Sequence, residues 1–152
     1  MKLLCFHAKE FRAKVFDNKT VGQQRRAEAR LRKRLTGVLP KLEENRREVK
    51  LENTIVSLVC VEKSDPSPRI WDARDFILHV KENVGASSVV IVPFGHLSAE
   101  PAIPIMAKEI IHLLLKFVRD IEPSAVDVIF GYDKSLLLDV PCHPFNARFA
   151  SF

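Results

Sequence analysis

The chain has 152 residues, which suits one compact domain, and 47% of them are hydrophobic, which argues against wholesale disorder. No apolar run is long enough to cross a bilayer. Three widely spaced cysteines without a C-x-x-C pair argue against a disulfide framework and indicate a reducing, cytoplasmic location. The net charge of +5 is concentrated in residues 22–50, which carry +6 and leave −1 for the remainder. Such a basic excess attracts polyphosphates such as RNA, although a solvated helix face has the same composition.

The N-terminal third is expected to contain two strands and one helix. Alternating apolar residues favour strands at 2–7 and 11–16, and the short link between them favours a hairpin. Residues 23–35 are rich in Arg, Ala and Leu, which predicts a helix, and a glycine and a proline follow to end it. Residues 41–50 are polar and indicate a loop or a weak helix.

The middle of the chain has the most regular pattern. Residues 54–61 are β-branched and apolar on both faces, which favours a central strand covered on both sides. A helix is expected over 70–83, with Gly85 well placed to cap its C-terminal end. The apolar run 88–94 then predicts a second buried strand.

The last part is expected to hold one helix and a hairpin. Ser98 is expected to cap a helix that tolerates two prolines in its first turns and runs to about Ile121, with Ile121 on the buried face. Strands are expected at 125–130 and 135–140. The residues 131–134 between them indicate a hairpin connection.

Taken in order, these elements predict an α+β fold. Strands meet both helices and hairpins, so the sheet should be mixed, with the helices packed on it. The whole chain, 1–152, is expected to form one domain, with a basic helical insertion at about 22–50.

Polar residues follow the ends of three expected strands. His7 leaves the first strand, and His96 follows Gly95, which allows a backbone to approach a ligand closely, beside the free N–H groups of a helix start. Lys134 lies beside apolar leucines, where partial burial would weaken its hold on a proton or place a charge near an oxyanion. Each has a plainer alternative: His96 hydrogen-bonded to a loop carbonyl, and Lys134 as an exposed turn lysine.

Together, these stretches resemble a known family. The sequence P-F-G-H-L-S after the central strand, F-G-Y-D-K in the last hairpin, the following H-P, and the early histidine are similar to the archaeal threonyl-tRNA synthetase editing domain. That domain shares its fold with D-aminoacyl-tRNA deacylases. The resemblance covers residues 1–16 and 54–146 and does not extend to the basic stretch.

The resemblance implies aminoacyl-tRNA editing, in which the ester that joins serine to threonine tRNA is hydrolysed at the terminal adenosine. It implies no cofactor and no metal, with the ribose 2′-hydroxyl assisting while the protein aligns water and ester. Carried over by motif, Lys134 and His96 are the catalytic candidates. The substrate-binding candidates, expected to share one pocket with them, are His7, Phe94, Gly95, Tyr132, Asp133 and His143.

The chain departs from the family pattern at three positions. Asp133 replaces a tyrosine before the lysine, Ala147 falls where the family has an acid, and Val140 falls where it has a cysteine. An ion pair between Asp133 and Lys134 would keep the amine protonated. These departures leave the substrate, and the retention of activity, open.

The expected partner is tRNA, bound at its 3′-terminal adenosine. The RNA-binding candidates of the basic stretch are Arg25, Arg26, Arg30, Arg32, Lys33 and Arg34. A free-standing protein acting in trans is also expected to serve a threonyl-tRNA synthetase that lacks its own editing domain, and the fold implies a homodimer. Two alternatives stay open: a non-catalytic tRNA-binding or synthetase-associated module of the same fold, and a small-molecule enzyme on a similar frame.

Overall fold

The structure is a computed structural model that describes residues 1–16, 37–65 and 69–152. Its elements, in chain order, are β1 (Lys2–Phe16), the 3-10 turn η1 (Glu44–Arg46), β2 (Glu48–Cys60), α2 (Arg69–Val84), β3 (Ser88–Pro93), the 3-10 turn η2 (Gly95–Leu97), α3 (Pro104–Arg119), β4 (Val126–Asp127), β5 (Asp133–Asp139) and β6 (Ala147–Ser151). The strands form one sheet in the order β4-β3-β2-β1-β5, with β6 also paired to β1. The predicted α+β class with a mixed sheet is confirmed.

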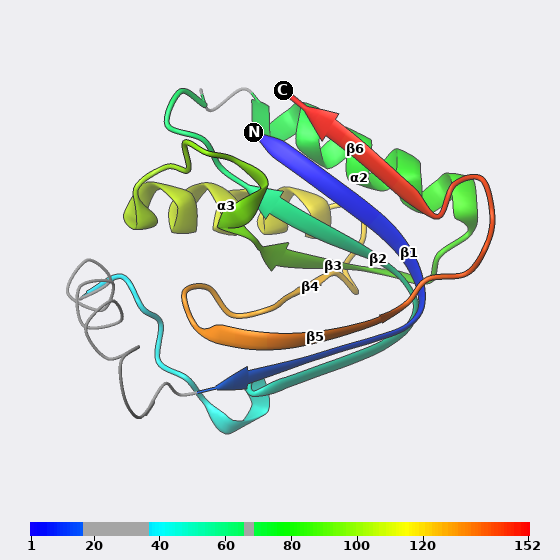
Figure 1. The fold of residues 1–152 in the computed structure, drawn as a ribbon, viewed down its shortest axis with the longest axis horizontal. Helices are drawn as coiled ribbons and strands as arrows, with labels where there is room; N and C mark the ends of the chain where they lie inside the picture. Colours follow the sequence, from blue (N-terminus) through cyan, green and yellow to red (C-terminus); the bar gives the residue numbers. More distant parts are fainter. Residues whose placement is uncertain (17–36, 66–68) are drawn as a thin grey trace.

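A long, bent ribbon of β1 and β2 organises the fold (Figure 1). The two strands pair antiparallel from Lys2–Cys60 to Lys14–Glu48, with a lapse where Asn53 has a positive φ of 46°. On its other edge, the N-terminal half of β1 pairs with β6 and the C-terminal half pairs with β5. The bend therefore folds half of the ribbon, with β5, under the rest of the sheet.

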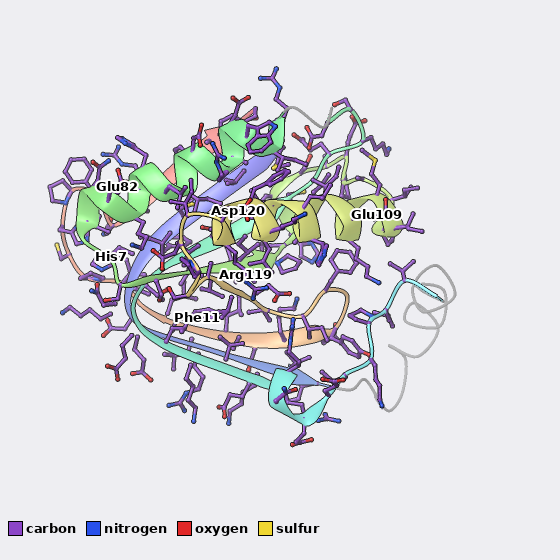
Figure 2. The ribbon with its side chains drawn as sticks, turned by 180° about the vertical axis from the view of Figure 1, so that it is seen from behind. His7, Phe11, Glu82, Glu109, Arg119 and Asp120 are labelled. Carbon is purple, nitrogen blue, oxygen red and sulfur yellow. The ribbon has the colours of Figure 1, made fainter. Side chains whose placement is uncertain are left out.

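Two hydrophobic cores result from this bend. The first lies between the sheet and the two helices, which contribute residues at helical spacing such as Ile77 and Leu114. The second lies between the two halves of the bent sheet and contains Phe11, which is labelled in Figure 2. Because successive strand residues face opposite sides, Ile55 enters the first core and Val56 the second. This explains why the central strand is apolar on both faces, as predicted.

Two predicted hairpins are wrong. The strands expected at 2–7 and 11–16 are one continuous strand, β1, because its intervening residues still pair with β2. The expected C-terminal hairpin is also absent, since β4 pairs parallel with β3 while β5 crosses to pair with β1 at the opposite edge. That crossing buries Val128 and Ile129 in the second core. The final strand β6 was not predicted, and most of its residues are exposed.

The helices are closer to expectation. Helix α2 and strand β3 match their predicted ranges within one residue at each end, and Gly85 follows α2 with a φ of 64°. The predicted Ser98 cap is wrong, because α3 begins at Pro104 after Ile103. Ile121 lies beyond the end of α3 and is 59% exposed. Neither helix in the described ranges is long and apolar enough to span a bilayer.

The expected helix at 23–35 and the six RNA-binding candidates within it lie outside the described residues. The last part of the basic stretch is described. It contains η1 and the first residues of β2, where a loop or weak helix was expected. This segment runs alongside α3 and the loop before β5: the hydroxyl of Tyr132 donates to the carbonyl of Pro40 at 2.8 Å, and Nζ of Lys108 donates to that of Val38 at 2.6 Å.

Candidate active site

A cavity of about 450 Å³, here called the main cavity, opens where β2 and β3 end. Its walls come from four segments: 59–61 at the end of β2, 93–96 after β3, the region around the start of α3, and 130–134 before and at the start of β5. Residues far apart in the sequence meet there because β3 lies parallel to β2, while the chain after β4 crosses beneath them. The volume is typical of small-molecule sites.

Six of the eight residues assigned by the family motifs line the main cavity. They are Phe94, Gly95, His96, Tyr132, Asp133 and Lys134. The two motifs P-F-G-H and G-Y-D-K therefore face one space.

His7 and His143 do not line the main cavity, so the expectation that they share its pocket is wrong. Strand β1 continues past His7, which pairs with Ile55 near the bend of the ribbon, while the cavity lies at the far end of β2. There His7 Nε2 donates to Asn53 Oδ1 at 2.8 Å, which leaves His7 Nδ1 to accept from His143 Nε2 at 2.8 Å. The two histidines meet each other instead of the catalytic candidates.

Lys134 brings a partly buried ammonium to the main cavity. Its Nζ donates a hydrogen bond of 3.1 Å to the carbonyl oxygen of Ile129. Burial lowers the pKa of Lys134 from 10.5 to about 8, although the nearby charges of Asp127 and Asp133 act in the opposite direction. At neutral pH the amine therefore remains mostly protonated and can face a developing negative charge.

The expected ion pair between Asp133 and Lys134 is not formed. Among the described residues, no carboxylate oxygen lies within 4.0 Å of Lys134 Nζ. Asp127 instead pairs with Arg46 at 2.9 Å. Since successive residues of a strand point to opposite faces, Asp133 is exposed while Lys134 is half-buried. The ammonium is thus held by a neutral carbonyl, which leaves its charge uncompensated at contact distance.

His96 lies at the exposed mouth of the main cavity, on η2 instead of at the start of α3. Its ring meets the edge of Phe94, with centroids 5.6 Å apart and planes at 72°. The turn is anchored by the N–H of Phe94, which donates to the carbonyl of Val59 at 2.9 Å. No described residue accepts or donates a hydrogen bond at the imidazole, so the plainer alternative of a loop-bound histidine is not seen in this part of the chain.

Cys60 is the one cysteine that lines the main cavity among the described residues. Burial, helped by the charge of Glu62, raises the pKa of its thiol above the ordinary value. The thiol donates to the carbonyl of Gly95 at 3.5 Å. This hydrogen bond supports the turn that carries His96. Because the thiolate is the reactive form and the raised pKa disfavours it, Cys60 is not an activated nucleophile.

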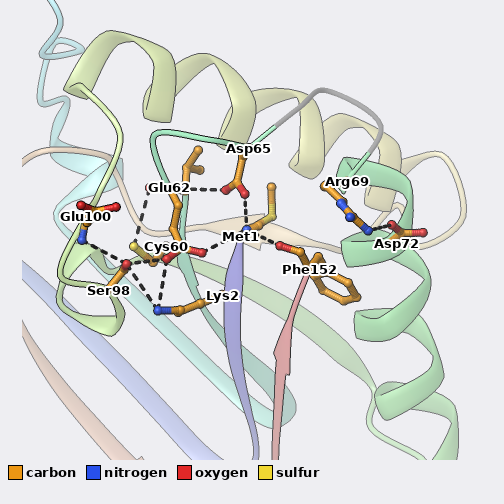
Figure 3. Close-up of polar contacts among 11 residues, drawn as sticks. Met1, Lys2, Cys60, Glu62, Asp65, Arg69, Asp72, Ser98, Glu100 and Phe152 are labelled. Carbon is orange, nitrogen blue, oxygen red and sulfur yellow. Dashed lines mark hydrogen bonds and ion pairs between the residues drawn. The ribbon is translucent and has the colours of Figure 1, made fainter.

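A polar network behind the cavity fixes the loop between η2 and α3 (Figure 3). The hydroxyl of Ser98 donates to Glu62 at 2.5 Å and accepts the N–H of Glu100 at 3.2 Å. Glu62 also pairs with Lys2 at 3.1 Å and with the amino group of Met1, which contacts Asp65 as well. Sequence reasoning missed this role of Glu62, because its side-chain partners come from two distant segments, the N-terminus and the loop that holds Ser98.

Gly131 shapes the wall beside Lys134. It has a φ of 81°, and a Cβ at this position would lie 2.5 Å from Leu39 Cδ2. The glycine therefore allows both the left-handed turn and the close approach of the 37–42 segment. No group of three or more His, Cys, Asp or Glu side chains in residues 1–16, 37–65 and 69–152 is arranged to hold a metal ion.

This chain is similar in sequence to threonine–tRNA ligases and to an editing subunit of one. A threonine–tRNA ligase editing subunit of Saccharolobus solfataricus is 35% identical over 98 residues, which are 64% of this chain and 25% of that protein. The threonine–tRNA ligases of Pyrobaculum neutrophilum and Methanococcus aeolicus are 36% and 30% identical, over 66% and 64% of this chain but 17% and 16% of their own lengths. The matched region is thus a quarter or less of each of these relatives.

The fold has a solved counterpart. The structure of a c-Myc DNA unwinding element binding protein superposes with a TM-score of 0.66 at 9% identity, over 100% of this chain and 99% of that one. At this identity the superposition shows that the two chains share a fold. The family described as the archaea-specific editing domain of threonyl-tRNA synthetase matches residues 1–151. This chain therefore belongs to the archaeal threonyl-tRNA synthetase editing-domain family.

Proposed function

We propose that this chain hydrolyses the ester of mischarged tRNA, removing serine from threonine tRNA in the main cavity. The observation that carries the proposal is the convergence of Lys134 and His96, from separate motifs, on one cavity in a chain of this family. A half-buried ammonium and an imidazole at the mouth provide one group for the reacting carbonyl and another for the ribose or water.

In the proposed reaction a water molecule adds to the ester carbonyl carbon. The carbonyl oxygen becomes an oxyanion, which Lys134 Nζ stabilises from its position beside the carbonyl of Ile129. The carbon–O3′ bond then breaks, O3′ takes a proton, and serine leaves with the oxygen of the water. The ribose 2′-hydroxyl and His96 orient the water, so most of the acceleration comes from alignment.

No covalent intermediate is part of this proposal. The described lining contains no serine or threonine hydroxyl, and the thiol of Cys60 is held protonated. Direct attack by water is therefore the route that the described side chains support best.

Because a pocket gains only about 1–3 kcal/mol from one methyl group, rejection of threonine requires steric exclusion in this cavity.

The proposal extends to the partners. We expect the chain to act in the cytoplasm on the acceptor end of tRNA, alongside a threonyl-tRNA synthetase, as a homodimer. The basic residues of 25–34 remain candidates for tRNA contacts. His7 and His143 are not included in the proposed site, because they pair with each other near the ribbon bend.

The test is hydrolysis of purified Ser-tRNA and Thr-tRNA, both made on threonine tRNA, with spontaneous hydrolysis subtracted. We expect rapid loss of the seryl ester and slow loss of the threonyl ester. Salt-dependent binding of both without cleavage would instead indicate the non-catalytic module that the Asp133 and Ala147 departures leave open.

A further inference from the structure

A second cleft lies next to the main cavity, on the side of η1 and the C-terminal end of α3. It has a volume of about 300 Å³, and its charged side chains are mostly basic. Its cations are Lys41, Arg46, Lys108 and Arg119, with His112 also in the lining, and its acids are Glu43 and Asp127. We call it the basic cleft. Its four cations exceed its two acids by a net charge of +2.

Two of these cations are positioned by neutral main-chain oxygens. Lys108 Nζ donates to the carbonyl of Val38 at 2.6 Å, and Arg119 Nε donates to the carbonyl of Ala125 at 2.7 Å. Arg119 lies at the C-terminal end of α3 (Figure 2). A carbonyl fixes a side chain without neutralising its charge, and each of these groups keeps further N–H donors. Such fixed cations lose little side-chain entropy when they bind an anion.

The acids of the cleft compensate only part of this charge. Asp127 is engaged by Arg46 at 2.9 Å, which fixes that guanidinium at the side of the cleft. Lys41 is exposed, and no carboxylate among the described residues pairs with it. The basic cleft therefore presents an arginine, two lysines and a paired arginine to any ligand that enters it.

The basic cleft adjoins the main cavity. Pro93, Ile111 and Phe130 line both spaces. A ligand with one end in the main cavity and a neighbouring group in the basic cleft would lie against Phe130. A tRNA acceptor end has this form, because its terminal adenosine is joined to the preceding nucleotide by a charged phosphodiester.

We propose that the basic cleft binds the phosphodiester that precedes the 3′-terminal adenosine of tRNA, while the adenosine and its ester occupy the main cavity. This inference rests on the proposed function and adds a substrate-positioning site to it. Arginine and lysine are the side chains that best bind phosphate oxygens, and a positioned phosphate fixes the register of the ester without reading a base.

The experiment compares three probes on the full chain: the trinucleotide CCA carrying a non-hydrolysable 3′-seryl amide, adenosine with the same amide, and inorganic phosphate. The variants are Lys41→Glu, the double variant Lys41→Ala/Arg119→Gln, and the control Lys116→Ala. Lys116 is exposed on α3 and does not line the basic cleft. Lys41→Glu is included because Lys41 is an exposed side chain, so that its replacement tests the charge of the cleft without disturbing the fold.

We expect the double variant to lose about 10- to 100-fold in affinity for the trinucleotide, as two charge-assisted contacts are removed. The slope of log affinity against log salt should fall by about 1 to 2. The adenosine amide should bind within about twofold of wild type, and Lys116→Ala should match wild type for every probe.

Equal loss for the trinucleotide and the adenosine amide would overturn the inference, and so would unchanged trinucleotide affinity in both cleft variants. Inorganic phosphate binding as tightly as the trinucleotide would overturn it too, because the cleft would then be a free-phosphate site. The proposed function is tested apart from this by Ser-tRNA hydrolysis. If trinucleotide affinity depends on the cleft residues but Ser-tRNA is not hydrolysed, phosphodiester binding in the basic cleft is upheld and the proposed hydrolysis is rejected. If Ser-tRNA is hydrolysed but trinucleotide affinity does not depend on the cleft residues, only phosphodiester binding in the basic cleft is rejected.

Discussion

Lys134 Nζ is hydrogen-bonded to the carbonyl oxygen of Ile129 across the loop that leads into β5. This contact closes the loop 130–133 on itself and holds the ammonium at the wall of the main cavity. Within the loop, the hydroxyl of Tyr132 is bonded to the carbonyl of Pro40. The position of the proposed catalytic lysine thus depends on a loop that is braced from two sides.

The burial of Lys134 predicts a pH-dependent stability. Because the pKa of Lys134 is about 8 in the folded state and 10.5 ordinarily, the unfolded chain binds more protons between these values. The unfolding free energy of wild type should therefore rise relative to that of Lys134→Met as the pH increases from 8 to 10.5, by on the order of 2–3 kcal/mol, and stay level below pH 8. Urea unfolding of both proteins across this range measures it. A constant difference would contradict the burial of the amine.

Gly131→Ala should destabilise the protein by about 1–3 kcal/mol, because alanine is strained at a φ of 81° and its Cβ meets Leu39. Gly37→Ala is the matched control, since Gly37 has a φ of 78° and open space around it. Gly37→Ala should show the backbone strain alone. Adding Leu39→Ala should cancel part of the Gly131→Ala effect in a double-mutant cycle of unfolding free energies. Additive losses would mean that the two residues do not meet.

Ser98→Ala should lower the unfolding free energy at pH 7 by about 1 kcal/mol, because Glu62 loses its hydroxyl donor. The Ser98 bond is the main reason that the pKa of Glu62 is lowered below 4.5. Its stabilising contribution is therefore present above that value and is lost as the pH falls through the lowered pKa. The difference between wild type and Ser98→Ala should shrink from pH 7 to pH 3, although the Glu100 contact persists. An unchanged difference would show that the bond does not depend on the carboxylate.

Asn53 should be sensitive to substitution, because its side chain ties the ribbon bend together. It donates to the carbonyl of Gly85 and to the hydroxyl of Ser87, and accepts from His7. Asn53→Ala should cost about 2–3 kcal/mol in thermal or urea unfolding. Asn53→Gly should cost less, since glycine relieves the φ of 46°. If glycine is no better than alanine, the backbone conformation is not under strain.

The helices and central strands could be predicted because their pattern is local. The spacing of Ile70, Ala73, Ile77 and Val80 marks one face of α2, and the apolar run of β3 marks a strand buried on both sides. The strand pairings could not be predicted from the sequence, because the partner of each strand is set by residues far away in the chain. Residues 125–140 have the composition of a hairpin, yet burial of Val128 and Ile129 in the second core sends β5 to the opposite edge.

The residues of the candidate site could be predicted only in part. Motif resemblance placed His96 and Lys134, and the structure brings them to one cavity. The resemblance also suggested His7. The sequence did not show that β1 continues past His7, which leaves this residue near the ribbon bend and away from the cavity at the end of β2. The support from Glu62 and the basic cleft depend on partners from several segments, so no local pattern marked them.

The most direct test is single-turnover deacylation of Ser-tRNA by wild type, Lys134→Met and His96→Ala, with Lys116→Met as the control on the surface of α3. Loss of an oxyanion-stabilising group typically slows such a step by about 10²–10³-fold, and we expect that loss for Lys134→Met with the control unchanged. His96→Ala should also slow the reaction. Cleavage at the wild-type rate by a folded Lys134→Met protein would contradict the assignment of the main cavity as the editing site.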